Sequence, residues 1–182
     1  MIDIQDKVKA TVTITESKIL EAATGDLACT IHRTIFIKGI GGFGHKGTMK
    51  SPIPALPKTA PTVVIEEKTQ ENCAFFYRLL CDHNPLHVDP DMSALGGFKT
   101  PILHGLASVG FTARILQQHF FKDAPELMKQ FTVRFMGVVY PGETLVVSAW
   151  KNGETIVFTT QVKERKGVCL LGMIVLHQQN KL

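Results

Sequence analysis

The sequence has few cysteines, no uninterrupted apolar run long enough for a membrane and no cluster of like charges, and each shortage excludes a class of protein. Its four cysteines, at positions 29, 73, 81 and 169, form no CxxC pair, which argues against a zinc ribbon or a disulfide framework. A membrane-spanning helix needs about 20 apolar residues in succession, so no span is expected. The net charge is only +4 and the basic residues are scattered, so no nucleic-acid partner is predicted.

The N-terminal stretch MIDIQDKVKATV carries charges where a signal peptide has an apolar core. With 182 residues, 45% of them hydrophobic and 20% charged, the chain has the composition of a globular protein of one domain or slightly more. We therefore expect a soluble intracellular protein with reduced thiols. Its mild positive charge favours a small anionic ligand.

Two groups of strands are predicted from alternating and β-branched residues. The first group comprises 8–15, which resumes over 17–23 after a short break, and 29–39. The second group comprises 131–138, 143–152, 154–164 and 167–178, with Asn152-Gly153 as a hairpin turn. Four prolines between residues 51 and 61 predict an extended connector.

Three helices are expected between the two groups of strands. The first follows Thr69, which can cap it, and ends near Leu80. A short turn of helix is expected at 91–95 and a long helix within 100–120. The long helix is apolar on nearly all sides, which predicts burial. One buried helix followed by antiparallel strands is an α+β pattern, and its simplest form is a long helix wrapped by a curled sheet.

The stretch GIGGFG at 39–44 follows a strand and matches the G-x-G-x-x-G pattern of dinucleotide-binding folds. That function needs a helix to open at the last glycine, and HKGTMKSPIP cannot form it. The alternatives are a glycine loop that needs positive φ angles and a loop whose backbone approaches another ligand.

The stretch CDHNPLHVD at 81–89 places five reactive side chains around an Asn-Pro pair. A zinc site would use Cys81, His83 and His87, with Asp82 or Asp89 and the distant His104, but the spacing fits no common zinc pattern. A polar turn is the second alternative, because Asp and Asn before Pro favour turns. The third is an acid–base site, in which the turn brings a carboxylate and an imidazole over one water molecule.

Gly105, in PILHGL, is a candidate donor to a developing oxyanion. Its N–H is free only if the helix begins close to it, near His104. Pro101 instead favours a start near residue 101. The two signals conflict, and the functional hypothesis requires the later start.

The stretch YRLLCDHNPLHVDPDMSALGGFKTPILHGL resembles the signature of the type 2, (R)-specific enoyl-CoA hydratases, which belong to the MaoC-like dehydratases and include the hydratase part of peroxisomal multifunctional enzymes. VRFMGVVYPGETL is similar to a later family segment, and IKGIGGFGHK resembles the glycine loop of the family's first repeat. The resemblance runs from about residue 30 to the end of the chain.

The resemblance implies a hot-dog fold and hydration of a trans-2-enoyl-CoA to the (R)-3-hydroxyacyl-CoA in fatty acid β-oxidation. It implies no metal and no cofactor, since CoA is part of the substrate. Asp82 and His87 would activate water, Asn84 would position it, and the Gly105 amide would hold the thioester oxygen. The residues expected to contact the substrate are Asp82, His83, Asn84, Pro85, Leu86, His87, Gly105, Phe135, Gly42 and Phe43.

The sequence departs from the family at Cys81, where glycine is usual, and at Leu80, where a small residue is usual. Related eukaryotic enzymes contain two fused hot-dog repeats. On that pattern residues 1–48 form part of a first repeat, 49–66 a connector and 67–182 a complete second repeat. Much of the usual acyl pocket would then be missing, and the unpaired half-sheet favours association, so a homodimer is expected.

The last residues, QQNKL, resemble the Ser-Lys-Leu peroxisomal address with Asn180 in place of serine. We therefore predict a peroxisomal location, with a cytoplasmic one as the alternative. Two further functions stay open on the sequence alone: a hot-dog acyl-CoA thioesterase and a non-catalytic acyl-CoA-binding remnant.

Overall fold

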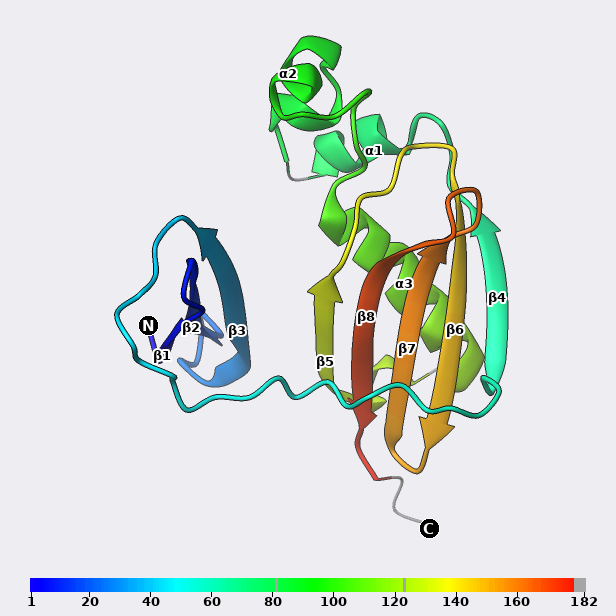
Figure 1. Cartoon of the computed structure of the whole chain (residues 1–182). Coiled ribbons are helices and arrows are strands. Elements are labelled where there is room, and N and C mark those ends of the chain that lie inside the picture. Colours follow the sequence, from blue (N-terminus) through cyan, green and yellow to red (C-terminus); the bar gives the residue numbers. More distant parts are fainter. Residues whose placement is uncertain (81, 123, 179–182) are drawn as a thin grey trace. The chain divides into compact units, whose positions relative to one another are not determined.

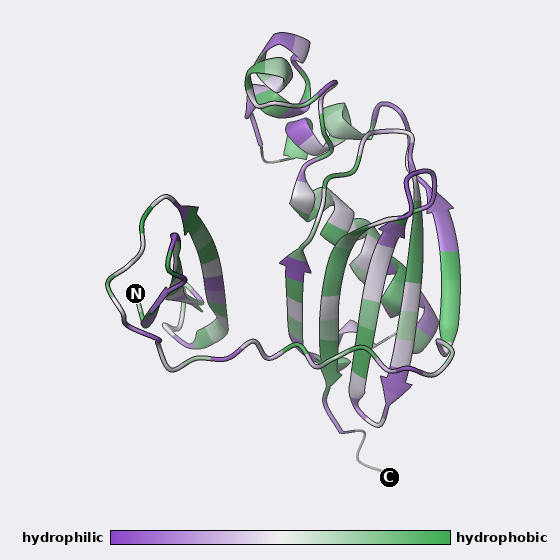
Figure 2. Cartoon of the chain, in the orientation of Figure 1, coloured by the Kyte–Doolittle hydropathy of each residue, from purple (hydrophilic) through white to green (hydrophobic). Residues whose placement is uncertain are grey.

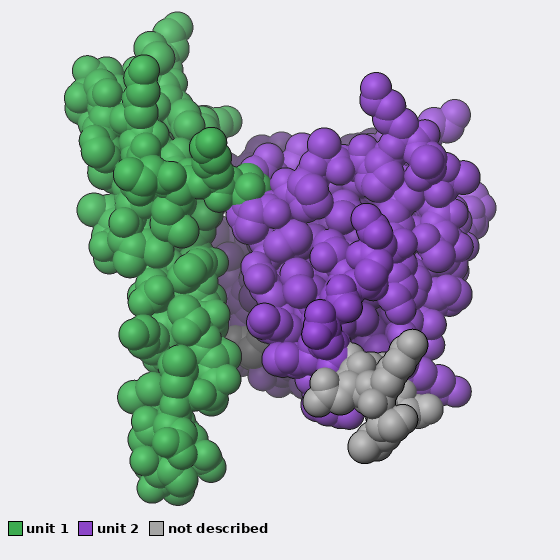
Figure 3. Space-filling view, turned by 90° about the horizontal axis from the view of Figure 1, so that it is seen from below, with its two compact units in different colours: residues 1–51 green, residues 52–182 purple. Residues whose placement is uncertain are grey.

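The computed structural model describes residues 1–80, 82–122 and 124–178. The chain divides into two compact units, Met1–Ser51 and Pro52–Leu182, which are coloured separately in Figure 3. Each unit has its own antiparallel sheet.

The first unit is a three-stranded sheet in the order β1-β2-β3, visible in blue in Figure 1. Its strands are β1 (Asp3–Asp6), β2 (Ala10–Leu20) and β3 (Leu27–Lys38). β2 runs without the break that was predicted after residue 15, and its pairing with β3 becomes irregular only between Ile19 and Leu20. The apolar side chains of β3, among them Ile31, Ile35 and Phe36, are exposed.

The glycine loop after β3 is confirmed as a loop that requires glycine. Gly39, Gly42 and Gly44 have φ angles of +82°, +84° and +78°, which are unfavourable for residues that carry a Cβ atom. The Asp6 carboxylate accepts hydrogen bonds from the N–H groups of Gly42 and Gly44, which holds the loop against the first sheet. No helix opens at Gly44, so the dinucleotide hypothesis is wrong.

The second unit is built on a five-stranded antiparallel sheet in the order β4-β6-β7-β8-β5 (Figure 1). The strands follow one another in the sheet as they do in the chain, except that β5 lies at the edge and pairs with the last strand, β8. The strands are β4 (Val63–Lys68), β5 (Met128–Phe135), β6 (Thr144–Asn152), β7 (Thr155–Val162) and β8 (Gly167–Leu176). Figure 2 shows that β8 is hydrophobic along most of its length, which agrees with the burial of most of its residues.

The turn between β6 and β7 lies one residue later in the chain than predicted. Asn152 pairs with Thr155, so the two-residue turn is Gly153-Glu154. Gly153 takes a φ of +57°, the left-handed conformation that glycine adopts without a steric cost.

Helix α3 (Gly105–Phe120) packs against this sheet and supplies the centre of the hydrophobic core. Its buried face comprises Ala107, Ser108, Thr112, Ile115 and Leu116. The opposite side is open, with Leu106 54% exposed, so the prediction of burial on nearly all sides is wrong. Within the core, the hydroxyl groups of Thr112 and Thr160 lie 2.8 Å apart and satisfy each other.

Four shorter elements complete the second unit: α1 (Cys73–Leu80), a 3₁₀ turn η1 (Pro85–His87), α2 (Pro90–Leu95) and a 3₁₀ turn η2 (Pro125–Leu127). The predicted cap Thr69 does not cap α1. Its buried hydroxyl donates to the carbonyl of Glu143 and accepts from the N–H of Gly142, which ties the end of β4 to the β5–β6 loop.

The α+β architecture and the long helix against an antiparallel sheet are confirmed. The boundary between the units follows Ser51, and β4 begins at Val63, inside the stretch predicted to be a connector. The interpretation of residues 1–48 as part of a first repeat stays a prediction. In the part of the chain that the structure describes, no helix has the length and apolar character that crossing a membrane requires.

Candidate active site

Residues 82–89, DHNPLHVD, fold into a tight polar turn between α1 and α2. The Asp82 carboxylate accepts the N–H of Asn84 at 2.8 Å, and the Asn84 side-chain oxygen accepts the N–H of Leu86 at 3.1 Å. Asp89 caps α2 by accepting the N–H groups of Asp91 and Met92. These local bonds explain why Asp and Asn occupy the turn, and they give Asp89 a structural role as a helix cap. Cys81 lies outside the described residues.

His87 is buried, with 9% of its surface exposed, at the end of η1. Its Nδ1 lies 2.8 Å from the carbonyl oxygen of Ile102. A carbonyl only accepts hydrogen bonds, so Nδ1 carries the proton in the neutral ring. The lone pair of the other ring nitrogen, Nε2, is then available to accept a proton from a water molecule.

His104, named from the sequence only as a possible zinc ligand, lies against this turn and was not predicted as a catalytic-site residue. Its Nε2 lies 2.8 Å from an Asp82 carboxylate oxygen, and its Nδ1 accepts the N–H of Leu106 at 3.0 Å. The ring stacks on Tyr77 and meets His87 edge-on, each with 4.8 Å between ring centroids. The sequence signal for this residue is the PILHGL segment, in which only the glycine was assigned a role.

The environment acts on the protonation of both Asp82 and His104. The N–H of Asn84 and the facing histidines, chiefly His104, lower the pKa of Asp82 below the ordinary aspartate value. Burial lowers the pKa of His104, and the repulsion from His87 adds to this, while the attraction of Asp82 opposes it. The hydrogen bond from Leu106 points to the same neutral state, because Nδ1 must keep its lone pair to accept it.

Asp82, His87 and His104 offer ligand atoms within 4.8 Å of one another, which is a combination that transition metals accept. The hydrogen bonds of His104 oppose that use. Because Nδ1 accepts from Leu106, Nε2 carries the proton and faces Asp82, and a metal ligand needs an unprotonated nitrogen. The arrangement therefore fits a hydrogen-bonded acid–base group better than a metal site.

The position of Gly105 resolves the conflict between the two predicted helix starts. Helix α3 begins at Gly105, with His104 as its N-cap, so the later start is correct. Within the described parts of the chain, the Gly105 N–H has no hydrogen-bond acceptor. A methyl group at this position would lie 2.8 Å from the Phe135 ring, so the absence of a Cβ atom allows the ring to pack against the start of the helix.

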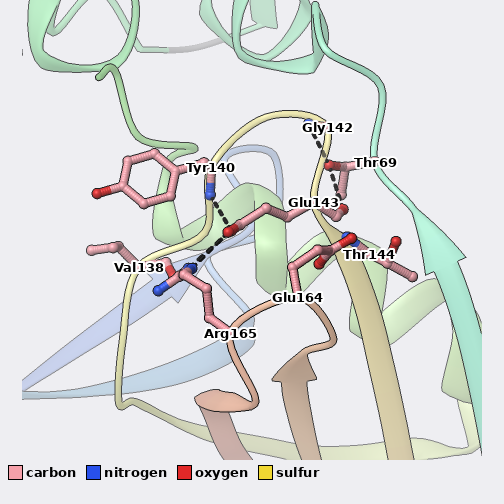
Figure 4. Close-up of polar contacts among 8 residues, drawn as sticks. All are labelled: Thr69, Val138, Tyr140, Gly142, Glu143, Thr144, Glu164 and Arg165. Atoms are coloured by element: carbon pink, nitrogen blue, oxygen red, sulfur yellow. Dashed lines mark hydrogen bonds and ion pairs between the residues drawn. The ribbon is translucent and has the colours of Figure 1, made fainter. Parts of the chain in front are cut away.

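A hollow of about 240 Å³ adjoins His87. One of its walls is the β5–β6 loop, which contributes Tyr140 and Pro141. Figure 4 shows how this loop is held: the Tyr140 N–H donates to the Glu143 carboxylate, and Arg165 pairs with the same carboxylate. Arg165 also donates to the carbonyl of Val138, so one guanidinium fixes both ends of the loop.

The remaining predicted substrate contacts divide into two groups. His83 and Pro85 are exposed and Leu86 is half-buried in the same turn. Gly42 and Phe43 belong to the other compact unit, so their part in this site stays a prediction.

The family model described as the MaoC like domain matches residues 52–170 of this chain. The chain belongs to the MaoC-like family. This MaoC-like chain is 36% identical to "Enoyl-CoA hydratase 2, peroxisomal" of Arabidopsis thaliana over 94% of its own length and 58% of that protein. It is 42% identical to "Peroxisomal multifunctional enzyme type 2" of Drosophila melanogaster over 89% of its length and 27% of that protein.

Two solved structures of 35% identity or more have the same fold. The MaoC-like dehydratase of Phytophthora capsici gives a TM-score of 0.86 at 35% identity, covering 98% of this chain and 63% of that one. The full-length Drosophila multifunctional enzyme gives 0.85 at 38% identity, covering 96% and 32%. These matches confirm the hot-dog fold of this MaoC-like chain. The chain spans a little over half of the Arabidopsis protein and about a quarter of the Drosophila one.

Proposed function

We propose that this chain catalyses the reversible hydration of trans-2-enoyl-CoA to (R)-3-hydroxyacyl-CoA in fatty acid β-oxidation. The observation that carries the proposal is the position of the buried His87, whose Nδ1 faces the Ile102 carbonyl and so leaves Nε2 for the substrate water, close to the Asp82 carboxylate, whose pKa is lowered. The name of the Arabidopsis relative supports the substrate class.

In the proposed reaction, His87 Nε2 removes a proton from water while the water oxygen adds to Cβ of the enoyl group. The electron pair of the double bond moves toward the thioester oxygen, which the Gly105 N–H stabilises. The imidazolium then delivers the proton to Cα, so His87 returns to its neutral state. Asp82 stabilises the transient imidazolium, and Asn84 helps to orient the water. Water and the thioester balance the reaction, so we propose that it needs no cofactor.

The test is an absorbance assay for loss of the conjugated double bond, with crotonyl-CoA and a longer enoyl-CoA, followed by determination of product chirality. Asp82→Asn and His87→Ala should each lower kcat by roughly 100-fold or more, because each removes a group that moves or stabilises a proton. Asp91→Asn is the matched control, since Asp91 is exposed at the start of α2 and its backbone N–H, which the substitution keeps, donates to Asp89.

The assay also separates the alternatives. Release of free thiol, measured with a thiol-reactive dye, would indicate a thioesterase. Binding of an enoyl-CoA without turnover would indicate a non-catalytic acyl-CoA-binding protein. Activity retained in both the Asp82→Asn and His87→Ala variants would disprove the acid–base assignment.

We also propose a peroxisomal location and a homodimer. The location rests on the peroxisomal relatives, and the tail that resembles a peroxisomal address lies outside the described residues. A fluorescent fusion that leaves the C-terminus free tests it. The dimer is supported by exposed apolar side chains on β3, including Ile31 and Phe36, and analytical ultracentrifugation tests it.

A further inference from the structure

One residue, His104, contacts both parts of the proposed machinery. One ring nitrogen, Nε2, lies 2.8 Å from Asp82, and the other, Nδ1, accepts the N–H of Leu106. The second contact caps α3, so that the helix begins at Gly105 and leaves the Gly105 N–H at its free end.

The orientation of this ring is fixed from several sides. Tyr77 stacks on one face with planes inclined by 20°, and His87 meets the ring at 61°. The His104 side chain is about three-quarters buried, and so is the Asp82 side chain. A ring held in this way has one donor direction and one acceptor direction, and these point to the carboxylate and to the helix end.

We propose that His104 is a positioning residue that holds the Asp82 carboxylate and the Gly105 N–H in one fixed relation. This inference deepens the hydratase proposal and rests on it for its kinetic consequences. His104 donates no proton to the substrate in this scheme. It acts through Asp82 on the water and through the start of α3 on the thioester oxygen.

Two substitutions separate the two contacts. His104→Asn places an oxygen close to the position of Nδ1, so it keeps the cap but does not reach Asp82. His104→Gln places an N–H close to the position of Nε2, so it keeps the donor to Asp82 but weakens the cap. His104→Asn should lower kcat by roughly ten- to a hundredfold with little change in KM and in Tm. His104→Gln should lower Tm, and it should lower kcat less than His104→Asn does, through the loosened start of α3 alone.

A double-mutant cycle shows whether His104 acts through Asp82. In the Asp82→Asn background, His104→Asn should lower kcat by less than about threefold, because the partner is already lost. The acidic limb of the pH dependence of kcat should move to higher pH in His104→Asn and stay in place in His104→Gln. Loss of fold is excluded for each variant by circular dichroism.

Imidazole ¹⁵N spectra of the unmodified protein test the same assignment without an activity. His104 should show a protonated Nε2 and an unprotonated Nδ1, and His87 the reverse. The reverse tautomer at His104, equal kcat in His104→Asn and the unmodified protein, or equal kcat losses in the Asn and Gln variants would each overturn the proposal. An absence of hydratase activity in the unmodified protein would instead refute the proposed function and leave the spectra as the test of His104.

Discussion

The Nδ1 of His87 donates its proton to the carbonyl oxygen of Ile102, two residues before the residue that caps the central helix. This bond sets the tautomer of His87 and ties the catalytic turn to the chain that leads into α3. Because Leu103 also pairs with Val139 through an N–H to carbonyl bond of 2.7 Å, the same short segment reaches the β5–β6 loop. These two bonds join three segments around the candidate site: the turn at 82–89, the segment before α3 and the β5–β6 loop.

Gly105→Ala should lower both the rate of hydration and the stability of the fold. The added methyl group would meet the Phe135 ring at 2.8 Å, so the ring or the helix end must move. Since Phe135 is half exposed, we expect a loss of about 1 kcal/mol in the free energy of unfolding and a fall in kcat through displacement of the N–H.

Gly110→Ala is the matched control in the same helix, because nothing lies within 4 Å of the position of its added methyl group. It should raise the free energy of unfolding by about 0.5–1 kcal/mol, since alanine favours helix over glycine. Adding Phe135→Leu to Gly105→Ala should recover part of the loss. If Gly105→Ala behaves like Gly110→Ala in denaturant titrations and in kcat, the close approach of Phe135 has no consequence.

Acid should destabilise the protein through His104 as well as through Asp82. The pKa of His104 is lowered from its ordinary 6.5, so below that pH the unfolded chain binds a proton that the folded chain does not. Stability therefore falls as the pH drops from about 6.5 toward the lowered pKa of the folded state. The pKa of Asp82 is also lowered, so its contribution is lost at still lower pH.

Thermal denaturation between pH 7.5 and 5 checks this. His104→Gln removes a titrating ring, so its Tm should depend less on pH in this range than that of the unmodified protein. Parallel curves for the two proteins would show that His104 does not change its protonation differently in the folded and unfolded states.

Arg165→Gln should loosen the β5–β6 loop that forms one wall of the hollow beside His87. It removes two contacts with the Glu143 carboxylate and one with the Val138 carbonyl. Arg165 is partly exposed, so we expect a loss of only about 1 kcal/mol in the free energy of unfolding, with a larger effect on KM than on kcat.

Lys163→Gln provides the comparison, because Lys163 pairs with Glu66 at a more exposed site. Its loss should leave the free energy of unfolding nearly unchanged, because exposed ion pairs contribute little to stability. Urea titration of both variants gives the two numbers, and a similar small loss in both would mean that the Arg165 contacts do not hold the loop.

Val8→Gly should stabilise the first unit. Val8 takes a φ of +69°, a left-handed conformation that a β-branched residue rarely adopts, and its side chain is 76% exposed. Glycine removes the steric cost without the loss of buried surface, so the free energy of unfolding of the first unit should rise by about 1 kcal/mol. Hydrogen exchange of β1 and β2 amides measures it, and Val8→Ala, which keeps a Cβ, should gain less. Equal protection in all three proteins would refute the strain.

Much of the fold was predictable from periodicity, because the later strands and the long helix have strong alternating or helical patterns. The failures fall where a distant residue decides the local structure. Thr69 was expected to cap α1, but its hydroxyl is used by the loop at Gly142 and Glu143. Pro101 favoured a helix start near residue 101, but His104 caps the helix, which begins four residues later, at Gly105.

The site was predictable where its residues are close in sequence and not where the fold brings them together. Asp82, Asn84 and His87 lie within six residues and were predicted together. The contact between Asp82 and His104 spans 22 residues and depends on the path of the chain through α2. Spacing alone gives no sign of such a contact.

The buried pair of Thr112 and Thr160 gives α3 a fixed height on the sheet. A slide of the helix by one turn, about 5.4 Å, would separate the two hydroxyls, and because both residues are fully buried, each hydroxyl would lose its partner. Apolar side chains alone tolerate small shifts, because a hydrophobic contact has no preferred direction. The pair therefore fixes the position of α3 along the sheet, and with it the position of Gly105, seven residues away at the start of the helix.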